Sequence, residues 1–128
     1  MNFMLGQQES SYQMRLETPS LAGFEKKGGQ ILAKGAAKRL SHLAFTRNSK
    51  GDWKFYIDGK VRSRGKLGGD FAKWKEGLRL GLGDDPGGEN RFWDGTFRLV
   101  AIYSRALSDS EMKRNFQAGP DHSQIVDR

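Results

Sequence analysis

Cysteine is absent from this 128-residue chain, which excludes disulfides, thiolate metal sites and cysteine nucleophiles. The two histidines, His42 and His122, have a spacing that fits neither a metal pair nor a catalytic triad. No stretch approaches the roughly 20 apolar residues that span a bilayer. Residues 1–6 lack the charged and apolar regions of a signal peptide, so none is expected in this chain.

Hydrophobic residues are also scarce, at 36% of the chain, whereas glycine is abundant at 17 residues. Three tryptophans, eight phenylalanines and three tyrosines accompany them. Aromatic residues favour strands, and glycine favours tight turns. The length fits one domain and leaves no room for a second core. The composition therefore predicts a single all-β domain rather than a helical bundle.

Positive charge exceeds negative charge, giving a formal net charge of +7. Seven basic residues stand against two acidic ones in one stretch: Arg47, Lys50, Lys54, Lys60, Arg62, Arg64 and Lys66. Such a stripe could attract nucleic acid, an anionic polysaccharide or an anionic surface. The alternative is a solvated sheet face whose lysines prevent edge-to-edge pairing, and we favour it because charge blocks are common on exposed strands.

A β-hairpin gives the clearest local signal. Residues 42–46 read as a short strand, and residues 53–57 read as an aromatic-rich strand with alternate side chains facing inward. Asp58-Gly59 follows and predicts a type I′ turn, because these residues adopt positive φ at low cost. Residues 60–63 then return as the partner strand.

Further strands are predicted along the chain, at residues 12–17, 30–33 and 77–83. Residues 96–103 are apolar on both faces over their second half, which predicts a central strand.

A single short helix is well specified near the C-terminus. Ser108 with Glu111 forms a capping box, and Leu107 with Met112 forms a hydrophobic staple. Gly119-Pro120 ends the helix.

Several motifs, taken in order, are similar to those of laminin-G-like domains. They are His-Leu-Ala-Phe-Thr at 42–46, Phe-Tyr-Ile-Asp-Gly-Lys at 55–60, Leu-Arg-Leu-Gly at 78–81, residues 95–103, and Arg-Ala-Leu-Ser at 105–108 with Glu111. The combination is more specific than any one piece, and it looks most like the bacterial branch of the family. The resemblance covers residues 40–119 and implies an antiparallel jelly-roll sandwich of the concanavalin A-like kind, with one short C-terminal helix.

Residues 2–16 resemble a strand pair from the middle of such domains. Because family members carry several strands before this point, the resemblance implies that N-terminal strands of the full domain are lacking. We assign residues 1–119 to the domain and residues 120–128 to a polar tail. A half-open sandwich exposes strand edges and apolar faces, which predicts self-association.

Calcium binding is a further implication of the resemblance. Calcium takes about six to eight oxygen ligands, and such groups surround a glycine-rich turn at Asp84, Asp85, Glu89, Asn90 and Asp94. The alternative is ordinary turn chemistry, since these residue types dominate turns. This chain also reads Phe97-Arg98-Leu99 where relatives often carry paired aspartates, so a cation replaces a carboxylate ligand.

Carbohydrate binding needs aromatic faces for the sugar ring and polar side chains for its hydroxyls. The aromatic candidates are Trp53, Tyr56, Trp74 and Trp93. A core role is the alternative, and it is stronger for Trp53 than for the two tryptophans in charged surroundings. The predicted ligand-binding residues are Trp74, Asn90, Arg91, Trp93 and Asp94, and the predicted metal ligands are Asp84, Asp85 and Glu89.

An enzyme is not predicted. Jelly-roll glycosidases need two carboxylates flanking a cleft, usually as Glu-x-Asp-x-x-Glu, and no such string occurs here. Nucleic-acid binding is not predicted either, because the sequence contains no RNA-recognition or helix-turn-helix motif. We therefore predict non-catalytic recognition of carbohydrate by an exported or cell-surface protein. The alternative is a protein–protein adhesion or assembly module without a sugar ligand.

Overall fold

The computed structural model describes residues 3–16, 30–36, 38–72, 74, 76–77, 81–83 and 95–120. Strands β1 (Phe3–Gln8), β2 (Ser11–Leu16) and β3 (Gln30–Lys34) form one antiparallel sheet in the order β1-β2-β3, here sheet A. Strands β4 (Leu43–Arg47), β5 (Asp52–Ile57) and β6 (Lys60–Lys66) form a second antiparallel sheet in the order β4-β5-β6, here sheet B. Helix α1 (Asp109–Ala118) follows.

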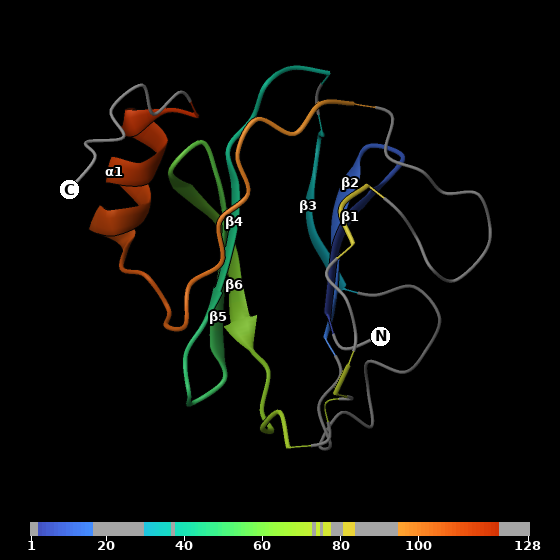
Figure 1. The fold of residues 1–128 in the computed structure, drawn as a ribbon, viewed down its shortest axis with the longest axis vertical. Coiled ribbons are helices and arrows are strands. Elements are labelled where there is room, and N and C mark those ends of the chain that lie inside the picture. Colours follow the sequence, from blue (N-terminus) through green and yellow to red (C-terminus); the bar gives the residue numbers. More distant parts are fainter. Residues whose placement is uncertain are drawn as a thin grey trace.

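The two sheets face each other, and α1 lies on the side of sheet B away from sheet A (Figure 1). This arrangement confirms the predicted all-β sandwich with one C-terminal helix. The predicted strands at 12–17, 30–33, 42–46, 53–57 and 60–63 all correspond to observed strands, with ends displaced by a few residues. Of the strand predicted at 77–83, residues 77 and 81–83 are described and none of them is in a strand, so the prediction is wrong at its two ends, and residues 78–80 lie outside the described residues.

The hairpin between β5 and β6 has the predicted turn. Asp58 and Gly59 have φ values of 53° and 72°, the positive pair that a type I′ turn requires. The Asp58 carboxylate also accepts hydrogen bonds from the backbone N–H of His42 at 3.0 Å and from the Arg39 guanidinium at 2.6 Å. The turn is therefore tied to the chain entering β4.

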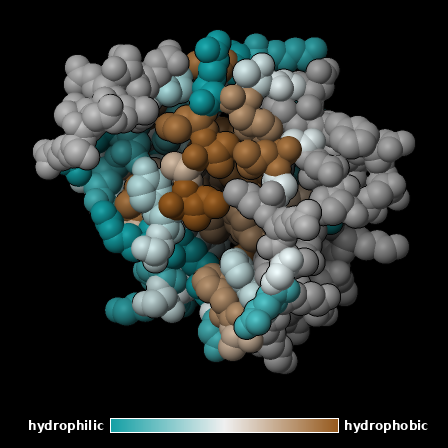
Figure 2. All heavy atoms as spheres, viewed as in Figure 1, coloured by the Kyte–Doolittle hydropathy of each residue, from teal (hydrophilic) through white to brown (hydrophobic). Residues whose placement is uncertain are grey.

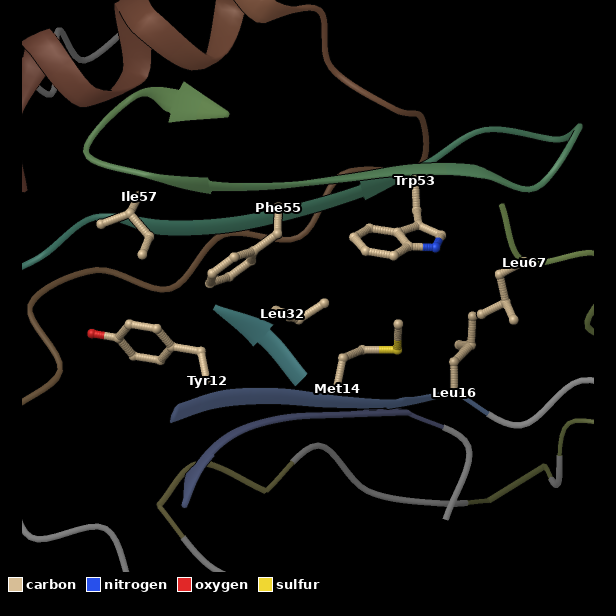
Figure 3. Close-up of a cluster of buried hydrophobic side chains, with 8 residues drawn as sticks. All are labelled: Tyr12, Met14, Leu16, Leu32, Trp53, Phe55, Ile57 and Leu67. Atoms are coloured by element: carbon tan, nitrogen blue, oxygen red, sulfur yellow. The ribbon is translucent and has the colours of Figure 1, made fainter. Parts of the chain in front are cut away.

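The core fills the space between the sheets. Its buried members are Tyr12, Met14, Leu16, Leu32, Trp53, Phe55, Ile57 and Leu67. Figure 3 shows the β2 side chains pointing toward those of β5. The prediction that alternate residues of β5 face inward is therefore confirmed.

Gly65 is required by the way Trp53 packs. The two residues are opposite each other in the β5–β6 register. A Cβ added at Gly65 would lie 2.7 Å from Cζ2 of the Trp53 indole, well inside van der Waals contact. The absence of a side chain lets the indole pack against β6 at Gly65, and Trp53 is 3% exposed.

The capping box and the hydrophobic staple are both confirmed. The Ser108 side chain accepts from the Glu111 backbone N–H, and the Glu111 carboxylate accepts from the Ser108 backbone N–H. Leu107 and Met112 are buried in one cluster with Tyr56 of sheet B. The staple therefore also fastens the helix to the sheet.

The predicted central strand at 96–103 is wrong. These residues have no regular structure and their side chains are exposed, with Leu99 at 53% and Ile102 at 75%. A strand needs a neighbouring backbone to complete its hydrogen bonds, and neither sheet of the described chain includes this segment. An apolar pattern indicates which faces could be buried, but it does not supply the partner strand.

Gly65→Ala should destabilise the fold by about 1–3 kcal/mol, because the methyl group collides with the Trp53 indole in a close-packed core. Urea unfolding followed by tryptophan fluorescence measures the loss in free energy. Gly68→Ala is the matched control, since a Cβ there meets nothing within 4 Å. Equal stability of the two variants would contradict this account of Gly65.

Candidate functional site

An open hollow of about 860 Å³ lies between the outer face of sheet B and the start of α1. We call it the hollow. It is lined by Thr46, Asn48, Asp52, Trp53, Lys54, Tyr56, Arg64, Gly65, Lys66, Ala106, Leu107, Ser108, Asp109 and Ser110. The lining combines residues of β4, β5 and β6, most of them on the outward face of sheet B, with the chain that leads into the helix. Segments about 50 residues apart in sequence are thereby brought together.

The alternation of β5 supplies the centre of the hollow. Because Trp53 and Phe55 face the core, Lys54 and Tyr56 face outward. Tyr56 is 1% exposed and packs with Leu107 and Met112, supported by Ala44 and Val61. This second apolar cluster joins the helix to sheet B and holds its first residues over the strands.

Asp109, the first residue of α1, links the helix to the sheet by polar contacts. Its Oδ1 atom accepts from Lys54 Nζ at 2.8 Å and from the Tyr56 hydroxyl at 2.7 Å. These two hydrogen bonds, the Lys54 bond first, hold the pKa of the Asp109 carboxyl below its usual value. Burial, followed by the bond to Asp109, raises the pKa of Tyr56 to about 12. At neutral pH Asp109 is ionised and Tyr56 is a protonated donor.

Three cationic side chains, Lys54, Arg64 and Lys66, lie on the two neighbouring strands that line the hollow. Arg64 of β6 is directly opposite Lys54 of β5, and Lys66 is opposite Asp52. Within the described part of the chain, the Arg64 side chain makes no hydrogen bond or ion pair, whereas the Lys54 side chain is paired with Asp109. The Arg64 charge still contributes to lowering the pKa of Asp109, so it acts on the centre of the hollow.

Trp74 is the one predicted ligand-binding residue that lies within the described residues. It is half-buried, packs against the core and contacts the Phe71 ring at a centroid distance of 4.4 Å. The Arg47 guanidinium lies 4.9 Å from the centroid of Phe71, which is 42% exposed. Arg47, Phe71 and Trp74 therefore form a small aromatic and cationic cluster, here called the ledge, and none of the three lines the hollow.

The other predicted site residues lie outside the described residues. They are the ligand-binding candidates Asn90, Arg91, Trp93 and Asp94 and the calcium candidates Asp84, Asp85 and Glu89. Among the residues that the structure does describe, no group of three or more His, Asp or Glu side chains could hold a metal ion. Calcium binding therefore stays a prediction. No described helix is long and apolar enough to cross a membrane.

The sequence indicated the basic residues of the hollow, but not its acidic centre. Lys54, Arg64 and Lys66 belong to the predicted basic stripe, and Tyr56 was among the aromatic candidates. Asp109 was missed, because its local context indicates only the first turn of a helix. Its contacts with Lys54 and Tyr56 come from tertiary packing of the helix on the sheet.

Residues 2–113 match a laminin-G family model described as the Concanavalin A-like lectin/glucanases superfamily. This match confirms the resemblance that the sequence motifs indicated. No curated protein matches the sequence. Among solved structures, the chain is similar to the 2.1 Å crystal structure of an S-layer domain-containing protein (residues 221–444) from Clostridium thermocellum ATCC 27405.

The similarity to that structure has a TM-score of 0.54 at 15% sequence identity, and it covers 89% of this chain. The chain spans 60% of the length of the clostridial one. At this identity the similarity concerns the fold alone.

Tyr56→Phe should raise the pKa of Asp109 and lower stability by about 1 kcal/mol at pH 7, because one hydrogen bond is lost. Asp109 has a lowered pKa in the folded state, so its bonds stabilise the fold above its unfolded pKa of about 3.9. That contribution disappears as the pH falls through the lower, folded pKa. Carboxyl NMR titration and urea unfolding at several pH values measure both effects.

Tyr103→Phe is the control for this substitution, since Tyr103 is 51% exposed and, among the described residues, its hydroxyl accepts a hydrogen bond from Asn115 and makes none with Asp109. An unchanged Asp109 pKa in Tyr56→Phe would contradict the hydrogen-bond network.

Proposed function

Because this chain belongs to the Concanavalin A-like lectin/glucanases superfamily, we propose that it is a non-catalytic module that binds carbohydrate. The hollow is the observation that carries this proposal. Ligand sites commonly have volumes of about 300–1,000 Å³ and a few well-placed polar groups, and the hollow has about 860 Å³. Its hydroxyl, amide, cationic and carboxylate groups supply both donors and acceptors, which sugar hydroxyls require.

The Asp109 carboxylate favours binding over hydrolysis. The superfamily includes both lectins and glucanases, and a glucanase needs a carboxylic acid whose pKa is raised, so that it can protonate the leaving group. The pKa of Asp109 is instead lowered by Lys54 and Tyr56. An ionised carboxylate with two fixed donors is suited to accept a hydrogen bond from a sugar hydroxyl, not to deliver a proton.

The ledge of Phe71 and Trp74 is a second place where a sugar could bind. Both rings retain exposed surface, and aromatic faces pack well against the apolar side of a pyranose. We propose that Trp74, together with the predicted loop residues Asn90, Arg91, Trp93 and Asp94, extends the binding surface beyond the hollow. The likeness to an S-layer domain-containing protein supports placing the module in an exported or cell-surface protein.

An exposed apolar segment favours a second candidate, a protein–protein assembly module. The segment is made of Phe97, Leu99, Val100, Ile102 and Tyr103. Figure 2 shows hydrophobic residues gathered near the middle of the face in view, where Figure 1 draws residues 95–108 crossing between the sheets. Large contiguous apolar patches on monomers often mark interaction sites. In this case sedimentation would detect self-association that Ile102→Lys abolishes.

Ala106→Trp should weaken glycan binding, because the indole occupies part of the hollow while its polar side chains stay in place. A glycan array and then titration calorimetry on one bound glycan measure the effect, which we expect to be a loss of about tenfold or more in affinity. Ala118→Trp is the matched control, because Ala118 is exposed at the other end of α1 and does not line the hollow.

Circular dichroism establishes that both tryptophan variants are folded. Unchanged binding by a folded Ala106→Trp variant would exclude the hollow as the site. A blank array with folded wild-type protein would exclude carbohydrate recognition and favour the assembly module.

A further inference from the structure

We propose that the carbohydrate bound in the hollow is anionic, carrying carboxylate or sulfate groups that Arg64 and Lys66 recognise. This inference rests on the proposed function and names its ligand class. Three cationic side chains line the hollow, Lys54, Arg64 and Lys66, against the carboxylates of Asp52 and Asp109. Cations are therefore in excess, but the arrangement of the charges matters more than their number.

The like charges of Lys54 and Arg64 do not by themselves stabilise the sheet. They are direct cross-strand neighbours in the β5–β6 register, and like charges in this relation destabilise a sheet. Local rules of this kind tend to be broken at functional sites. The Asp109 carboxylate already offsets part of this repulsion through its ion pair with Lys54, and an anion bound beside Arg64 would offset more of it.

The three cationic side chains differ in how far other protein groups neutralise their charge. Lys54 donates to Asp109 at 2.8 Å, so its charge is largely satisfied within the protein. Within the described residues, the side chains of Arg64 and Lys66 have no ion pair or hydrogen bond, and both residues are exposed on β6. Because both side chains are exposed and line the hollow, they are placed to contact a ligand bound there.

The geometry of arginine narrows the chemistry of the ligand. A guanidinium presents its N–H groups in a planar fork that matches carboxylate and sulfate oxygens, whereas a lysine acts as a point charge. With Lys66 two residues along the same strand, the two cations lie on one face and can contact neighbouring acidic groups on one chain.

Nucleic acid is a poorer match, because single strands bind proteins by stacking bases on exposed aromatic rings. The aromatic ring at the centre of the hollow, Tyr56, is 1% exposed and cannot serve as such a platform. Trp53 is also buried, in the core. An acidic sugar needs only the cations and the hydrogen-bonding groups that the hollow presents.

The test compares charged and neutral forms of the same glycan. The probes are oligogalacturonate and its methyl ester, sulfated dextran and dextran, and single-stranded DNA, all at one salt concentration. Arg64→Gln should weaken binding of the charged glycan about tenfold or more and leave binding of the neutral form within about twofold. Arg64→Lys should recover only part of the loss, because the fork is missing.

Arg114→Gln is the matched control, since Arg114 is an exposed residue of α1 that does not line the hollow. It removes the same charge and should change affinity less than about twofold. Equal loss in Arg64→Gln and Arg114→Gln would overturn the inference in favour of general charge attraction.

The remaining outcomes separate this inference from the proposed function. Neutral glycans that bind as tightly as charged ones, without dependence on Arg64, would overturn the anionic ligand but leave carbohydrate recognition intact. No binding of any glycan by folded protein would overturn both. Tighter binding of DNA than of every charged glycan, with the same dependence on Arg64, would overturn the inference in favour of a nucleic-acid site.

Discussion

Strand β5 divides its side chains between the two faces of sheet B, and both the core and the hollow depend on that division. Trp53, Phe55 and Ile57 fill the space between the sheets. Lys54 and Tyr56 project from the other face, toward α1. Because the side-chain period of a strand is two, a one-residue slip in register would exchange these sets. The buried aromatic residues on one face therefore fix the position of the polar groups on the other.

The start of α1 completes the hollow, and local contacts hold it in place. The capping box fixes the first turn, and the Arg105 guanidinium donates to both Glu111 carboxylate oxygens, at 3.0 and 2.6 Å. These bonds, the Arg105 bond first, lower the pKa of Glu111 to about 2. The helix therefore enters its first turn with Asp109 already directed at Lys54 and Tyr56, which reduces the ordering needed when a ligand binds.

The features predicted correctly from the sequence are those that local residues determine. The Asp58-Gly59 turn follows from backbone preference, and the Ser108–Glu111 box follows from the unpaired N–H groups of a helix start. The inward set of β5 follows from aromatic alternation. The contact of Asp109 with Tyr56 spans 53 residues of sequence and depends on tertiary packing, which no local pattern contains.

The incorrect prediction of a strand at 96–103 has the same cause, because a local pattern does not determine which segments pair. Its apolar residues suit a central strand, but a strand exists only where another backbone pairs with it. The predicted loop sites at Asp84, Asp85, Glu89, Asn90, Arg91, Trp93 and Asp94 lie outside the described residues, so they stay predictions. The hollow is formed by sheet B and the start of α1 together, so no local sequence pattern predicts it.

Chemical-shift mapping of a glycan titration tests most directly whether the hollow is a carbohydrate site. Backbone amide signals of a ¹⁵N-labelled chain would be followed while the tightest array ligand is added. The account predicts saturable shifts concentrated at Lys54, Tyr56, Arg64 and Ser110, which line the hollow. Saturable shifts confined to the exposed segment around Leu99 and Ile102, with the residues of the hollow unchanged, would contradict it.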